Sequence, residues 1–487
     1  MQPFMFIQYH RRPVVKAAMF FAVIAALILA GCGGGGTSAT TQPPSQPGSS
    51  QPSTTQVQVN LGDSPADQLV AFSMTINSMS MTKSAGGTVQ VVSAPMSIEM
   101  THLMGTMQPL GMVAVPQGTY NSATMSIGST VVSYMDPVSR TMKQKTMNGP
   151  FTATMNFNPA ITVGTSPMAL NMDMNMGMSV SIDGSGNVTF TPSVTCSTGA
   201  MGSGNGLDPE HGGMQHVVGS VSSTSTGSFS MSTMMGAQTL TFQVNSSTVF
   251  QGGLSGMGMM GSGMIVNVDA VMQSDGTMLA KTVRRMADSG GMMAGGLINA
   301  VTGSPATQLT LVAQNGMGSG MMQSVLANTV TVNVGTSTAY QLDQDDVSLS
   351  GLPFTPVFDA SHIYAGQRVD VDSSGAFSPG SGMGGMGGGM MAGTVTANEV
   401  ELAQQGFYGT VTNYSASGST ATFTLLIPLD SAFTTLTSAT TITVYQQSDT
   451  YLIGTTAIAN GNTLHVRGLL FYDGGVWKLV SGRIMMP

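Results

Sequence analysis

Apolar and polar residues alternate along most of this chain, the pattern of β-strands with one buried face. Phe72, Met74 and Ile76 share one parity, and the apolar positions then continue from Met79 on the opposite parity. A phase change of one residue predicts a β-bulge near Asn77-Ser78, because a bulge inserts one extra residue into a strand.

The clearest predicted strand spans residues 168–180. Every second residue from Met168 to Met178 is Met or Leu, and Asn171 and Asp173 occupy the other parity. This pattern predicts a half-buried strand whose inner face consists mostly of thioethers. Helical periodicity is scarce throughout, so we predict an all-β protein.

The C-terminal half is repetitive, which indicates tandem domains. Val218-Gly219-Ser220-Val221 and Phe407-Tyr408-Gly409-Thr410-Val411 open similar units, and a middle unit lies between them. Each unit has about five or six predicted strands, enough for a small closed barrel. The predicted organisation is a signal peptide (1–32), a tether (33–56), a β-sandwich (57–198), a His/Met linker (199–217) and three β-barrel repeats (218–290, 291–404 and 405–487).

Two short motifs carry a resemblance in the N-terminal region. These are Val57-Gln58-Val59-Asn60-Leu61-Gly62-Asp63-Ser64-Pro65 and Val115-Pro116-Gln117-Gly118-Thr119-Tyr120. They are similar to the opening strand and a hairpin of an uncharacterised domain family common at the N-terminus of bacterial surface lipoproteins. The repeats resemble a second uncharacterised β-domain that recurs in tandem in bacterial envelope proteins. Both resemblances imply β folds, and neither implies an activity.

The first 32 residues have the pattern of a bacterial lipoprotein signal. Three basic residues precede a short apolar stretch (17–29), which ends in Leu29-Ala30-Gly31-Cys32. This resembles a lipobox, which implies that Cys32 is acylated and becomes the new N-terminus. Residues 33–56 are Gly, Ser, Thr, Pro, Ala and Gln without a charge, so we expect a tether. The expected location is the bacterial cell envelope, at the outer membrane or cell surface.

Charge and motif content narrow the function. Charged residues make up 7% of the 487 residues, and the formal net charge is −8. A nucleic-acid binder needs clustered Lys and Arg, so this class is disfavoured. The sequence contains no Gly-x-Ser-x-Gly elbow, P-loop or His-Glu-x-x-His motif. We therefore predict that the protein is not an enzyme.

Methionine is unusually frequent, at 44 residues, and part of it lies in glycine-rich loops such as 256–264 and 382–391. Thioethers and imidazoles favour copper, and His211, Met214 and His216 lie within six residues as the best candidate ligands. Two other interpretations are a sink for oxidants and harmless substitution for leucine. We expect the strand methionines to be core residues.

The predicted function is a non-catalytic, lipid-anchored envelope protein with a binding, adhesion or structural role. Its expected partners are the membrane, through the anchor, and an envelope glycan or protein. One alternative is a methionine-rich copper-binding envelope protein. Another is a carbohydrate-binding surface module, for which five aromatic residues of the last repeat are candidates, although a place in the core is favoured for them: Tyr408, Tyr414, Phe471, Tyr472 and Trp477.

Overall fold

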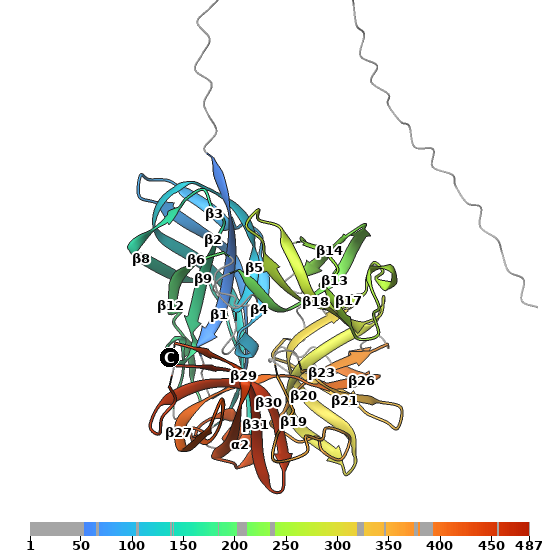
Figure 1. The fold of residues 1–487 in the computed structure, drawn as a ribbon. Coiled ribbons are helices and arrows are strands. Elements are labelled where there is room, and N and C mark those ends of the chain that lie inside the picture. The colour runs from blue at the N-terminus through green and yellow to red at the C-terminus, as the bar shows by residue number, and fades with distance from the viewer. Residues whose placement is uncertain are drawn as a thin grey trace, which may run out of the picture. The chain divides into compact units, whose positions relative to one another are not determined.

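The computed structural model confirms the all-β class (Figure 1). Pro52–Pro487 forms one compact unit. Among the described residues, no helix is both long and apolar enough to span a membrane. The structure describes residues 53–64, 68–103, 107–136, 139, 141–183, 185–201, 212–233, 239–318, 326–344, 347–374, 378–379, 393–454 and 457–486.

The N-terminal domain is a β-sandwich of two sheets. The first sheet has the order β12-β9-β1-β5, and the second has the path β3-β2-β6-β7, with β4 on β2 and β8 on β6. The first sheet contains β1 (Thr54–Ser64), β5 (Met107–Pro116), β9 (Met168–Asn175) and β12 (Val194–Ala200). The second contains β2 (Leu69–Lys83), β3 (Thr88–Val92), β4 (Met96–Glu99), β6 (Gly118–Met135), β7 (Met142–Met147) and β8 (Phe151–Val163). A 3-10 turn, η1 (Thr101–Leu103), follows β4.

Alternation along β2 places its apolar side chains between the two sheets. Phe72, Met74 and Ile76 are buried, and so is Met79 on the other parity. The pairing of β2 with β6 shifts between Ile76 and Ser78, which confirms the predicted bulge. The extra residue keeps both halves of this long strand facing the same core.

The strand predicted over residues 168–180 ends early. β9 stops at Asn175, and α1 (Met176–Ser179) follows before β10 (Val180–Ile182) pairs with β11 (Val188–Phe190). The Asn175 side chain accepts a hydrogen bond from the Met178 backbone N–H, 2.9 Å away, and so caps this turn. Met172, Met174 and Met176 are buried as predicted, but Met178 is 73% exposed because the turn breaks the alternation.

Barrel 1 (β13–β18) follows the sandwich. Its strands have the order β15-β14-β13-β17-β18-β16, and an additional pairing of β15 with β18 closes a ring. β13 begins at Gly213, inside the predicted linker 199–217, because Met214 already occupies a core position. The elements are β13 (Gly213–Ser225), β14 (Ser228–Thr233), β15 (Thr239–Gln243), β16 (Val249–Gln251), η3 (Met257–Met259), β17 (Ile265–Met272) and β18 (Met278–Ala287).

Barrel 2 (β19–β26) repeats this arrangement in an eight-stranded sheet with the order β22-β26-β23-β19-β20-β21-β25-β24. Only residues 397–398 separate β25 from β26. Because β25 pairs with β21 and β26 pairs with β23, the two together act as one strand that joins both ends of the sheet. The elements are β19 (Met292–Gly303), β20 (Ala306–Gly318), β21 (Thr329–Asn333), β22 (Ala339–Leu342), β23 (Arg368–Ser373), β24 (Ser378–Pro379), β25 (Gly393–Thr396) and β26 (Glu399–Leu402).

Barrel 3 (β27–β31) is closed in the order β27-β28-β29-β31-β30. When the strands are counted within each barrel, the three barrels share one order around the ring: first, second, third, fifth and fourth strand. In each barrel the third and fifth strands are parallel. A five-stranded Greek-key barrel of this kind is the OB type. The elements are β27 (Gln405–Ser417), β28 (Thr420–Leu426), α2 (Ala432–Thr437), β29 (Thr441–Ile453), β30 (Thr463–Asp473) and β31 (Val476–Met485).

One glycine recurs in the first strand of each barrel. Gly219, Gly296 and Gly409 pair with Val266, Val369 and Leu464 of the fourth strand. A Cβ atom at any of the three would overlap a backbone carbonyl oxygen of the second strand. The close backbone approach needed to bend the first strand around a small barrel therefore requires glycine here.

Methionine is unevenly distributed among the cores. The sandwich core contains ten buried methionines and that of barrel 1 contains six, whereas the core of barrel 2 contains Met292 alone among the described residues. In the described part of barrel 3, the buried core consists of Phe, Val, Leu, Ile and Trp. Met fills irregular gaps well, which suits the long and bulged strands of the sandwich.

Candidate functional site

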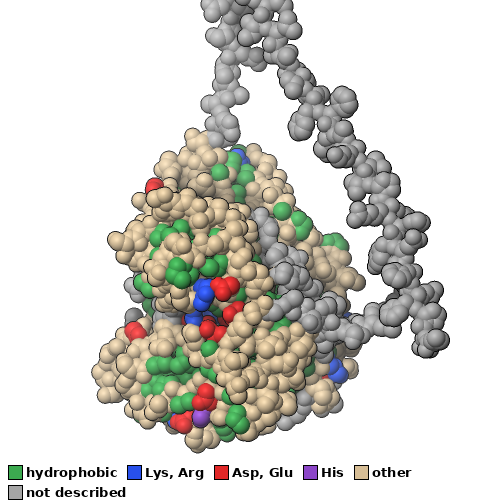
Figure 2. Space-filling model, turned by 90° about the vertical axis from the view of Figure 1, so that its right-hand side faces the viewer, with side chains coloured by type: hydrophobic (Ala, Val, Ile, Leu, Met, Phe, Trp, Pro, Cys, Tyr) green, Lys and Arg blue, Asp and Glu red, His purple; other side chains and the backbone are tan. Residues whose placement is uncertain are grey.

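Buried arginines gather where the sandwich meets the barrels. Arg284 lies on β18, Arg368 on β23, Arg467 on β30 and Arg483 on β31, and each is at least 91% buried. On the face in Figure 2, the largest group of charged side chains lies near the middle, amid mostly neutral surface. Buried Arg is rare unless its charge is balanced, so this concentration in a chain with 7% charged residues marks a candidate site.

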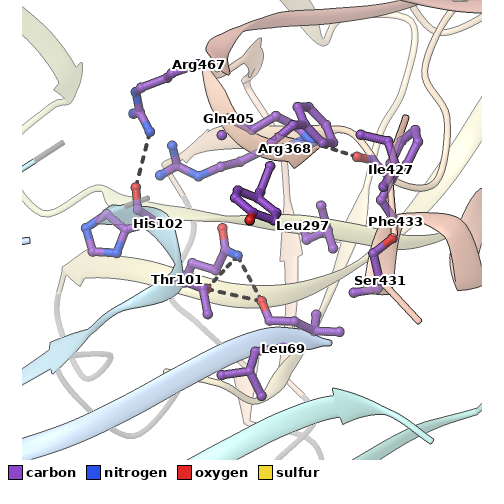
Figure 3. A pocket seen from close by; sticks show the side chains of 17 residues that line it. Leu69, Thr101, His102, Leu297, Arg368, Gln405, Ile427, Ser431, Phe433 and Arg467 are labelled. Atoms are coloured by element: carbon purple, nitrogen blue, oxygen red, sulfur yellow. Dashed lines mark hydrogen bonds between the residues drawn. The ribbon is translucent and has the colours of Figure 1, made fainter. Parts of the chain in front are cut away.

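The arginines influence one another. Burial lowers the pKa of Arg467 to about 9, and the positive charges of Arg368 and Arg483 contribute in the same direction. Asp343 and Asp370 oppose this change. The Arg467 Nη1 donates to the backbone carbonyl of His102, 3.3 Å away (Figure 3). Burial therefore disfavours the charged form of Arg467, and the neighbouring arginines add to that effect.

A cavity of about 80 Å³ lies beside these arginines, and we call it the junction pocket. Polar residues form about half of its wall: Thr101, His102, Gln314, Arg368, Gln405, Tyr408, Ser431 and Arg467. Apolar residues of the sandwich, barrel 2 and barrel 3 form most of the rest (Figure 3): Leu69, Val70, Leu297, Phe407, Ile427, Ala432 and Phe433. A cavity that combines apolar walls with convergent polar groups is the usual form of a small-molecule site.

Two polar atoms of this pocket lack a partner among the described residues. Arg368 donates from Nη1 to the Gln404 carbonyl, 2.9 Å away, but its Nε has no acceptor. Gln314 donates from Nε2 to the Val70 carbonyl at 2.9 Å and to Thr101 Oγ1 at 3.0 Å, and its Oε1 has no donor. Both atoms have almost no accessible surface, and a buried polar group left unpaired costs about 1–3 kcal/mol.

Local structure holds the pocket walls in place. Glu99 accepts from the backbone N–H groups of Phe72, Thr101 and His102 and contacts the His102 ring, which fixes η1. Ser431 caps α2 by accepting from the Thr434 backbone N–H at 2.9 Å. The two short helical elements that border the pocket are therefore each anchored by a side chain.

Aromatic rings support the apolar wall from behind. Phe433 packs edge-on against Phe407 at 5.2 Å and against Trp477 at 5.3 Å between ring centroids. Trp477 is 7% exposed and Phe471 is 2% exposed, so both are core residues, as the sequence favoured. Tyr408 instead lines the junction pocket. The single tryptophan thus lies one ring behind the pocket.

A second cavity of about 40 Å³, the acidic pocket, shares His102, Arg368 and Arg467 with the first. Asp343, Asp370 and Glu401 line it, together with His216 and Arg284. Arg284 forms an ion pair with Glu401 between barrels 1 and 2.

The surroundings of this ion pair shift the pKa of Glu401 in two directions. Burial raises the pKa of Glu401 well above its ordinary value, and the Asp343 and Asp370 carboxylates raise it further. Arg284 acts in the opposite direction. Arg284 therefore favours the charged form of Glu401, against the effect of burial and of the neighbouring carboxylates.

The structure separates the environments of the predicted copper ligands. Met214 lies in the core of barrel 1. His216 has a left-handed backbone (φ 54°) at a bulge in β13, where its N–H donates to Asp269 Oδ1 at 2.8 Å, and its side chain lines the acidic pocket. His211 and Cys32 lie outside the described residues. Copper binding stays a prediction.

Methionines of the glycine-rich segments are less exposed than their sequence suggests. Met260 and Met264 are 7% exposed and pack in barrel 1, while Met293 and Met317 are buried in β19 and β20. Met259 is 51% exposed. Residues 319–325 and 380–392, which hold most of the other loop methionines, lie outside the described part of the chain.

Cys196 behaves as a partly buried apolar residue on β12, packed against the sandwich core. Burial raises the pKa of its thiol to about 12, so the reactive thiolate is scarce at neutral pH.

Sequence reasoning missed the residues of the junction pocket. Arg368 opens the mixed strand β23, Arg467 lies 99 residues later in β30, and Gln314 lies on β20 between Ala313 and Asn315. Arg368 shares its parity with Asp370 and Asp372, so alternation places it on the polar face of the strand and gave no signal of its burial.

Comparisons with known proteins match two regions of the chain to uncharacterised domain families. Residues 54–192 match the model of a domain of unknown function (DUF4382), and residues 218–284 match that of another (DUF5666). No curated protein matches the chain.

Two solved structures are similar in part. One is the wild-type single-stranded DNA binding protein from Thermus aquaticus, with 11% identity and a TM-score of 0.14 over 40% of this chain and 92% of that one. The other is a deletion mutant of that same protein, with 13% identity and a TM-score of 0.13 over 40% of this chain and 93% of that one. Overall likeness this low carries no functional conclusion.

Proposed function

We propose that this chain is a non-catalytic binding protein of the bacterial cell envelope, anchored by lipid at Cys32, which holds a small organic anion in the junction pocket. The lipobox-like sequence Leu29-Ala30-Gly31-Cys32 supports the anchor. Tritiated palmitate fed to cells that export the protein tests it: label should be incorporated, and Cys32→Ala should abolish the labelling. Labelling that persists in Cys32→Ala would contradict the anchor.

Two guanidinium groups beside one cavity carry the binding proposal. The Arg368 and Arg467 side chains are each 93% buried, and both line the junction pocket. Guanidinium groups in a low-dielectric cavity bind an anion strongly, because charge-assisted hydrogen bonds exceed neutral ones. The Leu297, Ile427 and Phe433 wall supports an aliphatic group attached to that anion.

Titration with a matched pair of probes tests this function. We expect 4-methylpentanoate to bind and to change Trp477 fluorescence, because Phe433 stands between the pocket and the indole. The neutral analogue 4-methylpentanamide should bind at least tenfold more weakly. The acid should be recovered unchanged, since the proposed role is binding.

Substitutions in the junction pocket test whether the probes bind there. Arg368→Gln should remove the preference for the acid, and Leu297→Phe should weaken both probes by filling the cavity. Arg285→Gln is the matched control, because Arg285 is a partly exposed arginine that pairs with Asp288 outside the pocket. Equal affinity of acid and amide for the native protein, or no binding of either one, would overturn the proposal.

A further inference from the structure

The glycine-rich segment before β17 holds one of the two exposed methionines of the described chain. Met259 is 51% exposed in η3, and Met178 is 73% exposed in α1, whereas every other described methionine is at least partly buried. The neighbouring Met260 and Met264 are each 7% exposed and pack in the core of barrel 1. Met259 therefore lies at the surface, on a segment that buried residues hold in place.

The sulfur of Met259 has hydrogen-bond donors on one side. It accepts from Ser255 Oγ at 3.2 Å and from the Ser255 backbone N–H at 3.4 Å, and no other described group donates to it. A thioether sulfur has two lone pairs, one on each side of the plane of its two C–S bonds. Two donors of one residue at these distances cannot reach opposite sides of the sulfur. Ser255 therefore covers one lone pair and leaves the other uncovered.

We infer that Met259 is an oxidation site, whose sulfur takes up one oxygen atom from a peroxide on the side away from Ser255. The uncovered lone pair attacks one oxygen of hydrogen peroxide, so the S–O bond forms as the O–O bond breaks. The second oxygen leaves as hydroxide and takes the proton of the transferred oxygen, which gives water and the sulfoxide. The sulfur loses two electrons, and the peroxide gains them. Because a sulfoxide is chiral at sulfur, attack from one side yields mainly one epimer.

The place of Met259 suits a repairable sink for oxidants. Two classes of reductase return methionine sulfoxide to the thioether, and each acts on one epimer. A sulfoxide introduces a polar group, which disrupts a hydrophobic core. Met260 and Met264 supply the core contacts of this segment, so a sulfoxide at Met259 stays at the surface. The site is independent of the junction pocket.

Peptide mapping by mass spectrometry during treatment with hydrogen peroxide tests the site. In the native protein, we expect Met259 and Met178 to be oxidised at least about tenfold faster than Met260 and Met264, because oxidation follows exposure. Once both sulfoxides have formed, the thermal midpoint should lie within about 2 °C of that of the untreated protein. Oxidation of Met259 no faster than that of Met260 would overturn the site, and a larger drop in the midpoint would overturn its role as a sink.

The epimers at the two exposed methionines provide an internal comparison. The oxidised protein is digested, and its peptides are treated with a reductase specific for one epimer or for the other. We expect an epimer ratio of at least about three at Met259 and of about one at Met178, because no described residue donates to the Met178 sulfur. Equal amounts of both epimers at Met259 would overturn attack from one side.

Substitution of the serine is an independent arm. Ser255→Ala removes the shorter of the two hydrogen bonds to the sulfur and should lower the epimer ratio at Met259 at least about twofold. The ratio at Met178 should not change. Ser232→Ala is the matched control, because Ser232 is an exposed serine on β14 that makes no hydrogen bond to Met259. A native ratio in Ser255→Ala would contradict the assignment of Ser255 as the residue that covers one side of the sulfur.

Discussion

The buried ion pair between Arg284 and Glu401 gives the sharpest test of how the barrels are held together. Arg284→Met removes the cation that favours the charged form of Glu401, while Asp343 and Asp370 remain. Leaving one partner of a buried pair uncompensated costs about 3–5 kcal/mol. Each kcal/mol lowers the midpoint of a domain of about 150–250 residues by about 2–4 °C, so we expect a drop of roughly 6–20 °C at pH 8.

The cost should depend on pH in a defined direction. The folded pKa of Glu401 is already raised, so its contribution to stability is fullest below its unfolded pKa and is lost as pH rises through the folded pKa. Without Arg284 the pKa of Glu401 in the folded protein rises further. At pH 5 Glu401 is then protonated, and most of the lost stability of the variant returns. The destabilisation should therefore be smaller at pH 5 than at pH 8.

Thermal unfolding followed by far-UV circular dichroism at both pH values measures this effect. The double variant Arg284→Met, Glu401→Met is the control, and we expect it to recover to within about 1 kcal/mol of native or to exceed it, since an apolar pair avoids the desolvation of two charges. A loss below about 1 kcal/mol in the single variant, or a loss equal at both pH values, would refute the reasoning.

Three further predictions concern the sandwich, a barrel and the copper hypothesis. Burial raises the pKa of Asp63 well above its ordinary value, and the Asp173 and Glu99 carboxylates raise it further, so the contribution of Asp63 to stability falls as pH rises. Asp63→Asn should therefore raise the thermal midpoint at pH 8 and change it little at pH 4. Equal midpoints of the variant and the native protein at pH 8 would contradict this. Gly296→Ala should cost about 3 kcal/mol in chemical denaturation because its Cβ overlaps the Val312 carbonyl, whereas Gly335→Ala, which meets open space, should stay within about 0.5 kcal/mol. If copper is bound as the sequence suggests, competition titration with Cu(I) should detect a site that the triple change His211→Ala, Met214→Ala and His216→Ala removes; uptake no tighter than that of free methionine would reject it.

Side-chain parity accounts for the parts of the fold that were predictable. The shift from Ile76 to Met79 located a bulge in β2, and the parity of Met172, Met174 and Met176 identified a core face. Parity failed at Met178 because one capping interaction from Asn175 bends the chain, and a cap depends on backbone geometry that alternation does not encode.

The candidate site was hidden for a different reason. The residues that line it meet only when strands of barrel 2, the η1 turn of the sandwich and the α2 region of barrel 3 come together. A linear motif predicts groups near one another in sequence, as for His211 and His216, and these two residues guided the site prediction. Pockets shared by several domains leave no spacing to recognise.

The unequal distribution of methionine has a practical consequence for spectroscopy. Methyl groups of methionine give sharp signals in a large protein labelled with carbon-13 at that position alone. Ten buried methyls would report on the sandwich and six on barrel 1, whereas barrel 3, which reports through its single indole, would be nearly silent in such a spectrum. One labelled sample and one fluorescence trace would therefore follow opposite ends of the molecule separately as it unfolds or binds a ligand.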